Sequence, residues 1–265
     1  MLNDFELEKK ERQYFDLILL HLKQDLNALI NGLNSRIRIL NDWYENFIST
    51  ARSGYKASDL DTGAERIFHH FFAPILRFPN SAPIGSDLMF ELPDGFMHLE
   101  IKTALIDNPA DYRGKINIGI NQTSYGVNKI FSPNLPQYYR VSPEKEEKPC
   151  LTYIIQIVHE HAKPNIKALN LVCIPNGQLY PHYGKSIFRS GKAGYAKAKD
   201  FRYNYSAEPY FKLLSEKYSE KIFRVELVYL AKDVKKRPLP IFQMCQSIFN
   251  FRHLKMIVFI YKKFA

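Results

Sequence analysis

The chain has 265 residues, of which 46% are apolar and 14% aromatic, and its formal net charge is +10. This composition fits a globular protein with a real core, and the charge favours nucleic acid as the partner, although many basic proteins bind none. Three scattered cysteines give no zinc pattern or disulfide framework, the charged N-terminus lacks signal-peptide form and no apolar run could span a bilayer, so we expect a cytoplasmic protein without a membrane partner.

Residues 4–48 are predicted to be helical, because apolar residues recur close to the 3.6-residue period. Asn31-Gly32 is the expected break, with a second helix from Ser35 through Phe47. The apolar stripe should pack in a core or a dimer interface rather than bind a ligand. We therefore take residues 1–52 as an N-terminal helical region and residues 53–265 as one further domain.

The next helix is predicted from Ala64 to Ile75, with Asp61 or Thr62 as its cap. Glu65 then lies in the first turn. A carboxylate there either simply favours the helix dipole or is available to a neighbouring site, and the two interpretations remain open.

Residues 86–102 carry the pattern around which the rest of the chain is organised. Two short strands flank Pro93-Asp94-Gly95, which is turn chemistry. A loop over residues 92–95 places Asp87 opposite Glu100 on an antiparallel pair, where opposed side chains share a face. Lys102 shares it too, because side chains alternate along a strand. Since like charges destabilise a hairpin, the acidic pair needs a cation.

Asp87, Glu100 and Lys102, spaced D-x12-E-x-K, resemble the motif of the PD-(D/E)xK nuclease superfamily. The resemblance covers residues 65–102, and Ser86 stands where the motif has Pro. The alternative to an active site is an ordinary solvated surface hairpin, but Glu100 lies in a mostly apolar run. The motif therefore favours an active site.

The resemblance implies an α/β fold of the restriction-endonuclease type, with a mixed central sheet flanked by helices and the hairpin at the centre of the sheet. It also implies one or two Mg²⁺ held by Asp87, Glu100 and the carbonyl of Ile101, with Glu65 as a further candidate ligand. Lys102 would position and help to activate the attacking water.

Within the superfamily, a type II restriction endonuclease that hydrolyses double-stranded DNA at a specific sequence is the function we predict. The chain is compact and has no P-loop or other nucleotide-cofactor motif. A homodimer is compatible with this function. The alternatives are a structure-specific repair or recombination nuclease of the same superfamily and a non-catalytic nucleic-acid-binding protein.

Residues 115–120 alternate in polarity and are predicted to form a third strand. Four polar or aromatic residues then follow, Asn121, Gln122, Ser124 and Tyr125. They either cap a short helix toward Ile130 or contact DNA phosphate. The QxxY spacing resembles the QxxxY element of some branches of the superfamily, one residue short.

Residues 151–159 and 168–174 are predicted to be buried strands that extend the sheet, because they are rich in β-branched residues. A helix over residues 212–218 and a strand over residues 223–230 follow.

Residues 180–210 mix basic and aromatic side chains without an apolar period, which is typical of a flexible loop that faces DNA. A solvated linker is the alternative. We expect two arginines to read bases and the lysines to contact DNA; the six basic residues are Lys185, Arg189, Lys192, Lys197, Lys199 and Arg202.

Overall fold

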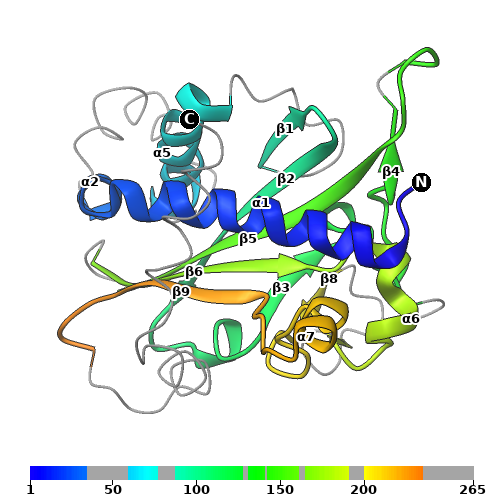
Figure 1. The fold of residues 1–265 in the computed structure, drawn as a ribbon. Helices are drawn as coiled ribbons and strands as arrows, with labels where there is room; N and C mark the ends of the chain where they lie inside the picture. Colours follow the sequence, from blue (N-terminus) through cyan, green and yellow to red (C-terminus); the bar gives the residue numbers. More distant parts are fainter. Residues whose placement is uncertain are drawn as a thin grey trace.

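The computed structural model describes residues 1–34, 59–76, 87–127, 131–140, 142–160, 165–190 and 200–234. These residues form a large sheet with strand order β1-β2-β5-β6-β9, a small sheet with order β3-β8-β7, and flanking helices (Figure 1). The large sheet contains β1 (Leu88–Leu92), β2 (Gly95–Leu105), β5 (Lys148–His159), β6 (Ile166–Ile174) and β9 (Val225–Leu230), and β4 (Tyr138–Tyr139) pairs with β5. The predicted α/β class with a mixed sheet is confirmed.

The strands β5 and β6 lie at the centre of the large sheet. Both are almost wholly buried, as expected of strands covered on two faces. Strand β2 runs parallel to β5, and the other pairs are antiparallel. The hairpin β1–β2 therefore lies at one side of the sheet, and its predicted central place was wrong, because the longer apolar runs of β5 and β6 occupy the centre.

Two N-terminal helices, α1 (Asp4–Gln24) and α2 (Leu26–Asn34), precede the sheet. The helix breaks at Asp25, which has non-helical φ −134° and ψ 51°, and not at Asn31-Gly32 as predicted. Gly32 stays helical because α2 packs against α5 (Asp59–Leu76); a Cβ at Gly32 would lie 3.9 Å from Cγ2 of Ile67. Tertiary packing thus outweighs the low helix propensity of glycine. The second helix predicted over residues 35–47 lies outside the described residues.

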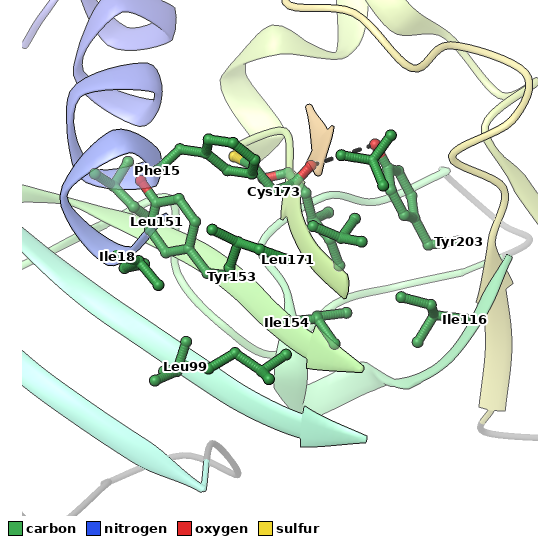
Figure 2. Close-up of a cluster of buried hydrophobic side chains, with 14 of the residues drawn as sticks. Phe15, Ile18, Leu99, Ile116, Leu151, Tyr153, Ile154, Leu171, Cys173 and Tyr203 are labelled. Atoms are coloured by element: carbon green, nitrogen blue, oxygen red, sulfur yellow. Dashed lines mark hydrogen bonds between the residues drawn. The ribbon is translucent and has the colours of Figure 1, made fainter. Parts of the chain in front are cut away.

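Helix α1 lies across one face of the large sheet (Figure 1). Its Phe15 and Ile18 belong to the same apolar cluster as Tyr153 and Leu171 of the sheet (Figure 2). The predicted core packing of the apolar stripe is confirmed. The proposed boundary between residues 52 and 53 falls outside the described residues and stays a prediction.

A buried ion cluster joins α1 to the far edge of the sheet. Arg224 places Nη2 3.2 Å from Oε1 of Glu8 and 2.7 Å from Oε2 of Glu11, and all three side chains are fully buried. The backbone N–H of Asn176 donates to Oε1 of Glu11 at 2.6 Å. Burial of an ion pair costs solvation that its own attraction must offset, so removing one partner should be costly.

The small sheet is formed by β3 (Ile116–Gly119), β8 (Asp200–Tyr203) and β7 (Phe188–Ser190). Strand β3 confirms the strand predicted over residues 115–120. Ile116, Tyr203 and Phe188 form one row across the sheet and are buried. The structure corrects the prediction of a flexible segment over residues 180–210, because residues 180–183 are helical and residues 188–190 and 200–203 are paired strands with buried aromatic residues.

The remaining helices and short turns flank the two sheets (Figure 1), and two elements near the end of the described chain were predicted from the sequence. Helix α7 (Lys212–Tyr218) and strand β9 confirm two predictions near the end of the described chain. The others are α5 (Asp59–Leu76), α6 (Tyr180–Tyr183) and the 3₁₀ turns η3 (Pro109–Asp111), η4 (Ile120–Gln122) and η5 (Gly177–Leu179). Within the described ranges, every helix is too short or too polar to cross a bilayer.

Candidate active site

The hairpin has the predicted register. Glu91 pairs with Phe96, and Leu88 pairs with Leu99, so Asp87, immediately before β1, lies opposite Glu100. The turn is tighter than the predicted four-residue loop, because residues 92 and 95 also pair. Oδ2 of Asp87 accepts a hydrogen bond of 2.6 Å from the backbone N–H of residue 101, which fixes the first carboxylate against β2.

Glu100 is fully buried below the surface of the site. Burial raises the pKa of Glu100 to about 8; Lys102 counteracts the rise, and the charge of Asp87 adds to it. Nζ of Lys102 lies 3.4 Å from Oε2 of Glu100. Oε1 of Glu100 has no hydrogen-bond partner among the described residues. A buried carboxylate oxygen without a donor is costly unless a cation reaches it.

Gln122 supports Glu100 from the turn η4. Its Nε2 donates to Oε2 of Glu100 at 2.8 Å, and its Oε1 accepts from the backbone N–H of Gly119 at 2.8 Å. The amide is therefore held at both ends and orients the carboxylate. The sequence placed Gln122 among the DNA contacts, and its weak QxxY match was the only signal of a link to the site.

The other candidates in residues 121–125 lie away from the carboxylates. Tyr125 is fully buried and donates to the carbonyl of Gly184 at 2.6 Å, while Oγ of buried Ser124 accepts from Gly177 at 3.1 Å. These two side chains stabilise the interior rather than face a groove. Asn121 is exposed, and its Oδ1 accepts from Asn134 at 2.8 Å. The short helix expected toward residue 130 does not begin within the described residues, because residues 123–127 are not helical and only the turn η4 comes before them.

A cleft of about 430 Å³ opens beside the hairpin. It is lined by Glu65, Asp87, Ile101, Lys102, Thr103, Asp111, Ile116, Asn117, Gln156 and Arg202. The cleft thus joins the end of β2 to α5, to the turn η3 and to the polar edge of the small sheet.

Glu65 reaches this cleft from α5. The helix begins at Asp59, so Asp61 and Thr62 are helical residues and not caps, and Glu65 lies beyond the first turn. The helix-dipole interpretation of Glu65 was therefore wrong, since that effect falls off within the first turn. Among the described residues, no three acidic, histidine or cysteine side chains are close enough to hold a metal together, so Glu65 lines the cleft without completing such a group.

The charges of the cleft fit a hard divalent cation. Asp111 pairs with Arg202, whose Nη2 lies 2.7 Å from Oδ1. Glu65 and Asp87 line the cleft beside the ammonium of Lys102, whose Nζ lies 3.4 Å from Oε2 of Glu100. Carboxylate oxygens are the ligands that Mg²⁺ prefers, and the unpartnered Oε1 of Glu100 supplies one in the right place.

Comparison with known proteins assigns the chain to a family. Residues 4–163 match the model of the N-terminal domain of the type II restriction enzyme MwoI, and residues 166–230 match the model of its central domain. The chain belongs to the MwoI family of type II restriction enzymes. This confirms the predicted enzyme class and rejects the non-catalytic alternative. No curated protein matches the chain.

Two solved restriction endonucleases share the fold of this MwoI-family chain. BglI bound to its DNA recognition sequence is 15% identical, with a TM-score of 0.55, over 86% of this chain and 94% of its own. Tetrameric SfiI bound to cognate DNA is 13% identical, with a TM-score of 0.58, over 88% of this chain and 87% of its own. These likenesses confirm the restriction-endonuclease-like architecture.

The basic candidates of the MwoI-family chain divide into three groups. Arg202 lies inside the cleft, and Lys185 and Arg189 are exposed. Lys192, Lys197 and Lys199 lie outside the described residues. Asp111 and Gln156 also line the cleft, and neither could be predicted, because neither belongs to a recognisable local pattern.

Proposed function

We propose that the chain hydrolyses phosphodiester bonds in double-stranded DNA, within a specific sequence, and that the reaction depends on Mg²⁺. The observation that carries the proposal is the meeting of three residues beside one cleft: Asp87 and Lys102 line it, and Glu100 lies 3.4 Å from Lys102 with a buried oxygen that lacks a donor. The membership of a type II restriction enzyme family supports the same chemistry.

Each residue of the site has a distinct role in this proposal. Asp87 and Glu100 would hold one or two Mg²⁺, with the carbonyl of Ile101 as a further ligand and Glu65 at the periphery. The ion supplies charge stabilisation on the phosphate and a lower pKa for an attacking water. Lys102 orients that water and offsets the charge that develops on the phosphate oxygens. Gln122 keeps the carboxylate of Glu100 in place.

DNA would lie along the cleft and the polar face of the small sheet. Asn117, Arg202 and Arg189 form one row across β3, β8 and β7, and opposed residues of antiparallel strands share a face. Asn117 and Arg189 are exposed, so both are available to phosphates or base edges. Lys185 and Asn121 extend the surface, and contacts by the three lysines at 192, 197 and 199 stay a prediction.

We propose that two copies act together. The described chain offers one set of catalytic residues, whereas a duplex has two antiparallel strands to cut. A homodimer would place one site on each strand, in the symmetric arrangement that most oligomers adopt. The cytoplasmic location expected from the sequence stays a prediction.

End sequencing of cleaved DNA tests the proposal. Purified protein is incubated with a long duplex of known sequence and Mg²⁺, and Asp87→Asn serves as the matched inactive control. We expect discrete fragments whose ends share one sequence, and none from the control. Uncut DNA, or equal cutting by Asp87→Asn, would overturn the proposed function. Ends without a shared sequence would instead favour a structure-specific nuclease.

A further inference from the structure

Arg202 lies inside the cleft rather than on a DNA-facing loop. It belongs to β8, its side chain is only 14% exposed, and it lines the same cleft as Asp87 and Lys102. A guanidinium enclosed in this way is poorly placed to extend to base edges in a groove. We propose that Arg202 binds a phosphate of the cleaved strand, at or next to the cut, and that Asp111 is the positioning residue that holds it there. The inference rests on the proposed function and deepens it.

The hydrogen bonds of Asp111 hold its carboxylate against Arg202. Oδ1 accepts from Nη2 of Arg202 at 2.7 Å, and Oδ2 accepts from the side-chain amide of Asn108. Its carbonyl accepts from Nε2 of Gln156 at 3.0 Å, and Oε1 of Gln156 accepts from Asn170 at 3.1 Å. Both carboxylate oxygens are thus engaged, so Asp111 serves to orient the guanidinium rather than to bind metal.

Arg202 keeps donors for a ligand. A guanidinium has five N–H donors in a planar fork, and the bond to Asp111 uses Nη2. Its buried Nε has no hydrogen-bond partner among the described residues. A phosphate has the geometry that this fork binds with two parallel bonds.

The other charges of the cleft make such a cation necessary. A phosphodiester that approaches Asp87 meets like charge, and Lys102 already lies 3.4 Å from Glu100. Arg202 is the second cation that lines the cleft. Its strand pairs with β3, whose Ile116 and Asn117 complete the same wall, so the small sheet holds this guanidinium beside the proposed cleavage site.

The alternative is an ion pair that only ties β8 to η3. In that case, replacing Arg202 lowers stability and leaves DNA contacts unchanged. A phosphate contact predicts instead that the effect of the substitution depends on one phosphate of the substrate. Neutral methylphosphonate groups, placed one at a time in the recognition duplex found by end sequencing, separate the two cases.

The experiment compares wild type, Arg202→Ala and Arg202→Lys, with Arg140→Ala as the control. Arg140 also pairs with a carboxylate, Glu147 at 3.5 Å, but does not line the cleft. Binding is measured with Ca²⁺ in place of Mg²⁺, and single-turnover cleavage with Mg²⁺. We expect Arg202→Ala to slow cleavage on the order of 100-fold and to lower the salt dependence of binding by about one unit of slope. The cleavage rate of Arg202→Lys should lie between those of wild type and Arg202→Ala. Arg140→Ala should match wild type in both cleavage and binding.

The decisive comparison is the methylphosphonate scan of binding. In wild type, one substituted phosphate at or next to the cut should weaken binding, and that loss should vanish in Arg202→Ala. Asp111→Asn keeps one acceptor for Arg202, so it should weaken DNA binding less than Arg202→Ala does. Its binding should still fall when the same phosphate is replaced by methylphosphonate. Thermal unfolding of each variant identifies effects that come from lost stability.

Two results separate the possible failures. If wild type cleaves, Asp87→Asn does not, and Arg202→Ala keeps every phosphate dependence of wild type, then the inference about Arg202 is wrong and the proposed function stands. If wild type does not cleave, or Asp87→Asn cleaves equally well, the proposed function itself fails.

Discussion

Replacement of Arg224 by methionine should destabilise the fold more than any surface substitution. The change keeps the approximate volume but removes a guanidinium that contacts Glu8 at 3.2 Å and Glu11 at 2.7 Å, all of them fully buried. It also leaves Tyr183 without the Nε donor at 2.8 Å. Buried carboxylates without their cation cost about 3–5 kcal/mol. At about 2–4 °C per kcal/mol for a chain of this size, Tm should fall by roughly 10 °C.

Urea and thermal unfolding of Arg224→Met measure this cost. The matched control is Arg140→Met, which removes a half-exposed arginine 3.5 Å from Glu147 and should cost less than about 1 kcal/mol. Adding Glu11→Gln to Arg224→Met should recover part of the stability, because one stranded carboxylate is removed. Equal stability of Arg224→Met and Arg140→Met would refute the view that this cluster ties α1 to the sheet.

Three further predictions concern single carboxyl and amide groups. Burial raises the pKa of Glu11 to about 7 from its ordinary 4.5, because desolvation of the carboxylate outweighs the attraction of Arg224. Between about pH 4.5 and 7 the folded state holds a proton that the unfolded chain has lost, so stability should fall as the pH rises through this range, and Glu11→Gln should flatten that fall in urea unfolding. Gln122→Ala should raise the Mg²⁺ concentration for half-maximal cleavage by about 10–100-fold, and an unchanged metal requirement would show that this hydrogen bond is dispensable. Glu65→Gln should slow cleavage less than loss of Asp87 does, and a rate and Mg²⁺ requirement identical to those of wild type would remove Glu65 from the site.

The hairpin of the candidate site was predictable because its determinants are local. A proline-containing turn, strand alternation and short spacing fix the register that places Asp87 opposite Glu100. The same reasoning identified Lys102 on the shared face. Here sequence distance and spatial distance agree, so a pattern of residues translates directly into a site.

The remainder of the cleft could not be predicted, because it depends on pairing between distant segments. Arg202 reaches the site only because β8 pairs with β3, and Asp111 is held by Gln156 from β5. The buried cluster of Arg224 likewise joins residues more than 200 positions apart. Composition indicated a basic, aromatic segment at residues 180–210, but only the pairing shows that the aromatic side chains of its strands are buried, that Lys185 and Arg189 are exposed and that Arg202 lines the cleft.

Glu100→Gln provides the most direct test of the metal-dependent active site. The substitution keeps the shape of the side chain and removes a buried charge, so the protein should be at least as stable as wild type. The measurement is the single-turnover cleavage rate of the recognition duplex as a function of Mg²⁺ concentration. We predict a saturable Mg²⁺ dependence of the cleavage rate in wild type and a cleavage rate lower on the order of 100-fold or more in Glu100→Gln. Equal rates and equal Mg²⁺ dependence in the two proteins would contradict it.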